Sequence, residues 1–170
     1  LTQRYFTVGS VLTINIPISN QYYVGNGTDM TQISGTKTVT RVDSTTRTIS
    51  VTNAKATSSE GTINWQCERT TTRTYDAGYG LWGDEFITYG NASGTNIKGV
   101  NFTAVVTQDD PLLKRLETGC ARNFVDGAVT ITNQDGGVLV LDYDPYNDQA
   151  CDKTAQVTIN GGEPKIITLR

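Results

Sequence analysis

Histidine is absent from this chain of 170 residues. Without an imidazole the chain has no Ser-His-Asp or Cys-His catalytic arrangement, no histidine metal ligand and no ordinary side chain that titrates near neutral pH. Adjacent carboxylates occur only at 84–85 and 109–110. Neighbours along a strand point to opposite faces, which does not suit the two facing carboxyls of a glycosidase. The sequence therefore predicts a protein that is not an enzyme, with no catalytic residue.

Charge and long apolar runs are also scarce. Only 18% of the residues are charged, and the 14 Lys and Arg are scattered along a chain of net charge −3. Binding to nucleic acid requires clustered Lys and Arg, so we expect no nucleic-acid partner. No run approaches the roughly 18–20 apolar residues of a membrane span, and no basic segment followed by an apolar one opens the chain. We expect a soluble chain without a transmembrane segment, from which any signal peptide has been removed.

Threonine is in excess, with 28 residues, whereas the residues that fill helices are scarce. Thr is β-branched and suits a pleated strand, and its hydroxyl satisfies water without a charge. A surface low in charge and rich in Thr, Asn, Gly and Tyr is typical of proteins outside the cell. We therefore expect an extracellular or outer cell-surface location.

Apolar and polar residues alternate along most of the chain, which is the period of a half-buried strand. In 11–18 the apolar residues at positions 12, 14, 16 and 18 share one parity, and Pro17, which lacks an N–H, predicts that this strand lies at an edge or ends there. Segments 129–132 and 138–141 form one predicted hairpin, and 157–159 with 166–169 form another. The pattern predicts an all-β, antiparallel β-sandwich or flattened barrel in a single domain, 1–170.

One segment has helical content. Pro111 followed by Leu, Lys, Arg and Glu residues, with Asp109 or Asp110 as a cap, predicts one short helix near 111–117.

The three cysteines do not have the spacing of a metal cage, and no histidine could complete one. A disulfide between Cys120 and Cys151, with Cys67 left over, is the better interpretation. Cys67 follows Trp65 in strand parity, which favours a small buried apolar residue over a reactive thiol or an intermolecular bridge.

Several phrases of the sequence recur together in one group of proteins. They are GTKTVT at 35–40, GTINW at 61–65, ASGTN at 92–96, LDY at 141–143, CDKTAQVTING at 151–161 and ITLR at 167–170. In this order and spacing the chain resembles a group of uncharacterised secreted and lipoprotein-like proteins of the Bacteroidetes, over nearly its whole length. The resemblance implies an exported β-rich domain whose paired cysteines fall on Cys120 and Cys151, and it brings no established activity.

The chain departs from that group in two places. Similar members carry a further strand ahead of the region around Arg4, and their glycine-rich turn before Cys151 is here longer and more acidic. A sandwich short of one strand would expose an edge to which a neighbour could add a strand. The strand of residues 12–18 is where we expect such an edge.

The acidic turn offers hard oxygen ligands at Asp142, Asp144, Asp148 and Asp152, the type that Ca²⁺ prefers. The spacing is not that of an EF-hand, because the glycine and the closing Glu are missing. A solvated acidic loop is the favoured interpretation, and calcium the alternative; no other cofactor is expected.

Aromatic side chains gather near turns, above all at Tyr79 and Trp82 in a glycine-rich segment and at Tyr146 in the acidic turn. Exposed rings of this kind stack on sugars or anchor a protein partner, although Trp82 could equally cover an end of the fold. The sequence thus predicts a cell-surface structural or interaction protein. It would be a subunit of an extracellular filament or surface assembly, joined to a protein partner or to itself by strand addition. The alternative is a glycan-binding accessory module that uses these aromatics.

Overall fold

The computed structural model describes residues 7–20, 22–25, 29–75 and 81–169, and every structural statement below concerns these residues. The first strands are β1 (Val11–Ile16), β2 (Tyr23–Gly25), β3 (Met30–Arg41), β4 (Thr46–Ser58), β5 (Gly61–Thr74) and β6 (Glu85–Thr95), with a 3-10 turn at Ile18–Asn20. The others are β7 (Asn101–Val106), β8 (Leu112–Arg115), β9 (Ala128–Asn133), β10 (Val138–Asp142), β11 (Thr154–Ile159) and β12 (Lys165–Thr168).

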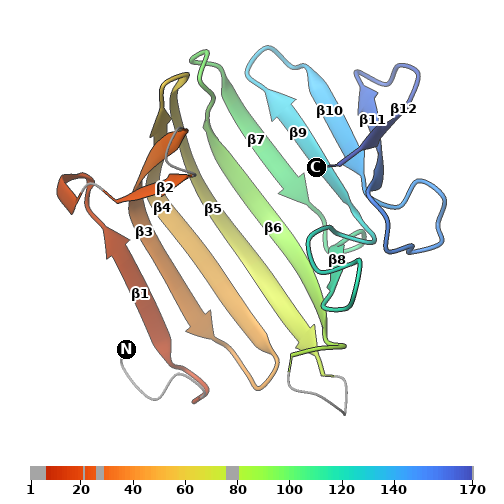
Figure 1. Ribbon diagram of the computed structural model, residues 1–170, viewed down its shortest axis with the longest axis horizontal. Helices are drawn as coiled ribbons and strands as arrows, with labels where there is room; N and C mark the ends of the chain where they lie inside the picture. Colours follow the sequence, from red (N-terminus) through yellow and green to blue (C-terminus); the bar gives the residue numbers. More distant parts are fainter. Residues whose placement is uncertain (1–6, 21, 26–28, 76–80, 170) are drawn as a thin grey trace. The chain divides into compact units, whose positions relative to one another are not determined.

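These strands form one antiparallel sheet that does not close, in the order β1-β3-β4-β5-β6-β7-β9-β10-β11-β12, with β2 on β3 and β8 on β6 (Figure 1). The all-β, antiparallel class predicted from the sequence is confirmed. The arrangement differs from the predicted sandwich or flattened barrel, because the described strands make one open sheet. Alternation with period two marks a face that favours burial, but it does not specify what covers that face.

The short helix predicted near 111–117 is wrong, since Leu112–Arg115 form strand β8. β8 pairs with β6, with Thr88 opposite Leu112 and Glu85 opposite Arg115. A helix of about seven residues is marginal by itself, so burial decides the conformation. As a strand, the segment buries both Leu112 and Leu113.

The chain divides into two compact units. Unit 1 comprises residues 1–69 and 91–103, and unit 2 comprises residues 70–90 and 104–170. The single domain spanning 1–170 stays a prediction, and each unit is described by itself.

Unit 1 has almost no core. Among its described residues the buried apolar side chains are those of Ala54 and Cys67. β3 and β4 pair with a register shift between Ser34 and Thr36, and Asn53 opposite has a φ of 51°. Gly35, at φ 134°, allows the strands to approach here, because a Cβ would lie 2.7 Å from the Cα of Ala54.

Unit 2 contains the larger core. Leu113, Cys120 and Val125 are buried together, with Ile87 packed against them. The Asp84 side chain is fully buried and forms an ion pair with Arg73. A buried carboxylate needs such a partner, because desolvation strongly disfavours an isolated charge.

The hairpins follow the turn chemistry of the sequence. β9 pairs with β10, and β11 pairs with β12, which confirms both predicted hairpins. In the turn between β3 and β4, one carboxylate oxygen of Asp43 accepts hydrogen bonds from the N–H groups of Thr45 and Thr46 at 2.8 and 2.7 Å. These bonds, that from Thr45 first, lower the pKa of Asp43 to about 2.

Candidate interaction surfaces

An apolar hollow lies on one face of unit 1. It has a volume of about 280 Å³, and its apolar lining is Ile14, Ile16, Ile33, Val51, Ala54 and Trp65. These side chains come from β1, β3, β4 and β5, whose alternation directs them to the same face. Ile14 keeps 44% of its surface exposed. Burying an isoleucine side chain contributes about 1.5–3 kcal/mol of free energy. Covering this face would therefore stabilise a complex with a partner.

β1 is the first strand in the strand order of the sheet, and one side of its backbone faces away from its neighbour β3. Arg41 of β3 donates its N–H to the carbonyl of Ser10 at 3.0 Å. Bonded positions alternate along an antiparallel pair, so the even-numbered residues of β1 bond to β3. Thr13 and Asn15 then direct their N–H and C=O groups away from β3, where the described part of the chain holds no strand to receive them.

β12 is the last strand in the strand order, and one side of its backbone likewise faces away from its neighbour β11. Leu169 donates its N–H to the carbonyl of Lys153 at 2.7 Å, which fixes the odd-numbered residues as those bonded to β11. Ile166 and Thr168 direct their backbone groups outward, and within the described residues no strand lies beyond them. The side chains of Ile166 and Ile167 are 51% and 37% exposed.

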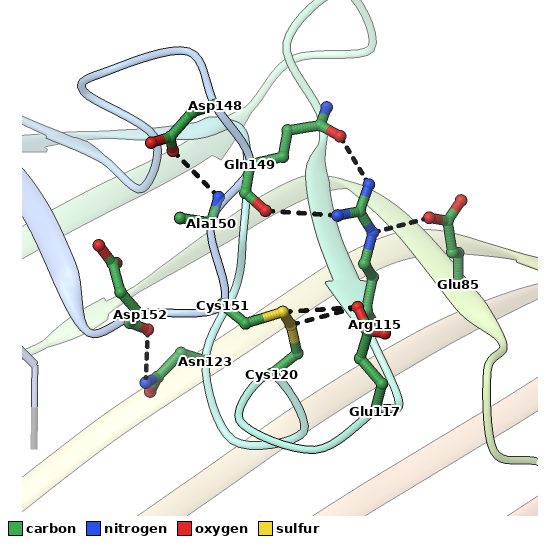
Figure 2. Close-up of a disulfide and its surroundings, with 10 residues drawn as sticks. All are labelled: Glu85, Arg115, Glu117, Cys120, Asn123, Asp148, Gln149, Ala150, Cys151 and Asp152. Carbon is green, nitrogen blue, oxygen red and sulfur yellow. Dashed lines mark hydrogen bonds and ion pairs between the residues drawn. A yellow bond between two sulfur atoms is a disulfide. The ribbon is translucent and has the colours of Figure 1, made fainter.

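The Cys120–Cys151 disulfide predicted from the sequence is present in unit 2, with the Cα atoms 4.7 Å apart (Figure 2). A carboxylate oxygen of Glu117 lies 3.5 and 3.4 Å from the two sulfurs. A disulfide sulfur carries no hydrogen, so these are contacts and not hydrogen bonds. Cys67 is free and buried, which confirms the burial expected from its parity.

Arg115 holds the acidic turn to the sheet. Its guanidinium donates to Glu85 Oε1 at 2.8 Å, and to Oε1 and the carbonyl oxygen of Gln149 at 2.7 and 3.3 Å (Figure 2). The Gln149 amide in turn donates to Asp126 at 2.6 Å. The disulfide at Cys151 and the hydrogen bonds at Gln149 together attach the acidic turn to the rest of unit 2.

The four carboxylates proposed as calcium ligands each shape the turn. Asp144 is buried and accepts the N–H groups of Asp148 and Gln149 at 3.0 and 3.1 Å. Asp142, Asp148 and Asp152 accept backbone N–H groups two residues further on, at 2.8, 3.0 and 2.7 Å. These are the local bonds that favour turns.

Among the described residues, no three of these carboxylates place ligand oxygens within 4.8 Å of one another. Among the described residues, the group of three acidic or sulfur ligands within 4.8 Å of one another is Glu117, Cys120 and Cys151. Metals bind cysteine as the thiolate, which the disulfide removes. A calcium site in the acidic turn stays a prediction.

The structure describes two of the three aromatic residues predicted as contacts. Tyr79 lies outside the described residues. Trp82 and Tyr146 are 54% and 61% exposed, so both rings are accessible. Trp82 therefore does not cover the end of the fold as a buried side chain.

Two ion pairs were not predicted from the sequence. Asp84 and Glu85 are adjacent, but the first pairs with Arg73 and the second with Arg115. The alternation of neighbours along a strand predicts that the two carboxylates separate, whereas the choice of arginine depends on the pairing of β6 with its neighbours.

The fold and these surfaces define a β-rich antiparallel sheet protein that carries a disulfide. Comparisons of the chain with protein-family models, with curated proteins and with solved structures find no match. In the described part of the chain, no helix has the length and apolar character needed to cross a membrane.

Proposed function

We propose that this protein is an exported bacterial cell-surface structural or interaction protein, a subunit of an extracellular assembly that binds its neighbours by strand addition. The observation that carries the proposal is the pair of sheet edges at β1 and β12, with outward backbone groups at Thr13, Asn15, Ile166 and Thr168. Such edges accept a strand from another chain, with backbone hydrogen bonds that supply affinity and side chains that supply specificity.

The apolar face of unit 1 supports the same proposal. Sheets normally bury an apolar face against a second layer, and the described residues of unit 1 bury only Ala54 and Cys67 among their apolar side chains. A partner seated on this face would complete the two-layer arrangement that the sequence pattern predicts. Ile14 would belong to both contacts, since it lies on β1 and lines the hollow.

Export is supported by the disulfide. Disulfides persist in oxidising compartments such as the periplasm and the cell surface, and reducing pools remove them from most cytosolic proteins. The Cys120–Cys151 bond is thus consistent with the composition rich in Thr and Asn and with the resemblance to secreted proteins.

The test uses the full-length natural protein in the cell that makes it, with an epitope tag. We expect the tag to be accessible to protease on intact cells, and the protein to sediment as a large assembly. Thr13→Pro removes an outward N–H of β1 without removing a bond to β3, so it should release the protein from the assembly. Thr13→Val keeps the N–H and the branched side chain, and is the matched control.

Cytosolic protein, or equal sedimentation of the Pro and Val variants, would contradict the proposal. Circular dichroism of both purified variants verifies that Thr13→Pro still folds. A photo-crosslinking amino acid at Thr13 in the otherwise natural chain gives an independent result, because strand addition requires a cross-link to an adjacent strand.

The second candidate function is glycan binding by the exposed rings of Trp82 and Tyr146. Their exposure supports it, since aromatic faces stack on sugars. Binding to a glycan array that is lost in Trp82→Ala and Tyr146→Ala, with the half-buried Tyr143→Phe as control, would favour this function. Absence of binding with and without calcium would exclude it.

A further inference from the structure

β1 and β12 stand at the two ends of the strand order. Ten strands lie on the path from β1 to β12, and neighbouring strands are antiparallel (Figure 1). β12 of one copy, paired antiparallel with β1 of a second copy, would continue the pattern of the sheet.

The two units also carry opposite net charge. Unit 1 has seven Lys and Arg against four Asp and Glu, a net charge of +3, and unit 2 has seven against thirteen, a net charge of −6. β1 belongs to the basic unit and β12 to the acidic unit. Contacts between like units repel, whereas a contact of unit 1 with unit 2 of another molecule is attractive and is favoured during encounter.

Apolar side chains accompany both edges. Ile14 on β1 is 44% exposed, and Ile166 and Ile167 on β12 are 51% and 37% exposed. Pairing the strands would bring these side chains to within cross-strand distance, where aliphatic pairs stabilise a sheet. Backbone hydrogen bonds, apolar contact and net charge therefore favour the same occupant of each edge.

We propose that the strand added to β1 is β12 of a second copy of this chain, so that copies join head to tail through β1 and β12. The contact uses two different surfaces, so it does not close on itself as a two-fold dimer does, and it can extend into a filament. This inference rests on the proposed function, which requires strand addition but not that the partner be the same chain.

The test uses two purified full-length variants, each blocked at one edge. Thr13→Pro removes an outward N–H at β1, and Thr168→Pro removes one at β12. We expect the natural chain to form a series of oligomers in analytical ultracentrifugation, and each Pro variant alone to lose them and sediment as a monomer. An equimolar mixture should sediment as a dimer, because one variant retains β12 and the other retains β1. Thr13→Val and Thr168→Val should behave as the natural chain does.

The dependence of the oligomers on salt concentration is a second test. Raising NaCl from about 0.1 M to about 1 M shortens the Debye length from about 10 Å to about 3 Å, so the oligomers of the natural chain should shift toward monomer. Cross-links between ¹⁵N-labelled and unlabelled natural chains, formed by a photo-crosslinker at Thr13, should map to β12 of the other copy. This measurement needs neither Pro variant to fold.

The outcomes separate the two proposals. A natural chain that is monomeric at high concentration, or a Thr168→Pro variant that still dimerises through β1, overturns head-to-tail self-assembly. If the cellular protein nevertheless sediments in an assembly that Thr13→Pro disrupts, strand addition to another protein stands. If the cellular assembly is indifferent to Thr13→Pro, both proposals fail.

Discussion

Removing the Cys120–Cys151 disulfide should strongly destabilise the chain. The two cysteines are 31 residues apart, and closure of a loop of this length lowers the entropy of the unfolded chain by an amount worth about 3.7 kcal/mol near room temperature. Cys120 is fully buried, so truncating it to Ala adds about 1 kcal/mol for the cavity. The double variant Cys120→Ala/Cys151→Ala should therefore lose about 4–5 kcal/mol in free energy of unfolding.

Urea unfolding followed by circular dichroism measures this loss, with and without a phosphine reductant. Cys67→Ala is the matched control, since it truncates a buried cysteine but keeps the disulfide. The control should lose about 1 kcal/mol and should remain sensitive to the reductant. A loss below about 1 kcal/mol in the double variant would refute the reasoning, because the loop would then contribute no constraint of the expected size.

Three further predictions concern single side chains. Arg73→Met leaves the buried carboxylate of Asp84 without its cation and should lower the free energy of unfolding by about 3 kcal/mol in urea titrations, much of which Arg73→Met/Asp84→Leu should restore. The pKa of Asp43 is lowered, so its contribution to stability is complete above its ordinary value of 3.8 and is lost as the pH falls toward about 2; an NMR titration midpoint near 3.8 would contradict this. Gly127→Ala, whose Cβ would overlap a backbone carbonyl, should cost at least about 2 kcal/mol more in urea unfolding than Gly136→Ala, which has a similar positive φ in open space, and equal losses would contradict the steric argument.

Local patterns predicted much of the secondary structure. The alternation in 11–18 and the missing N–H of Pro17 predicted a strand that ends before the proline, and β1 ends at Ile16. The Asn and Gly residues at 133–137 and 160–162 predicted turns, and hairpins form there. These features depend on neighbours in the sequence, which is why single-sequence reasoning reaches them.

Features set by distant parts of the chain were not predictable in this way. Leu112–Arg115 has helix-forming residues but pairs with β6, because that position buries Leu112 and Leu113. The candidate ligand Asp144 is buried by the turn that it organises. Alternation alone also does not reveal whether the layer that covers an apolar face belongs to the same chain.

Pairing of β1 with β12 between copies can be measured by residue-resolved amide hydrogen exchange of the natural chain at low and high concentration. Strand addition places the outward amides of Thr13 and Thr168 in intermolecular hydrogen bonds. We expect both amides to become protected at high concentration, while protection of the amides bonded within the sheet changes little. Equal exchange of Thr13 and Thr168 at both concentrations would contradict it.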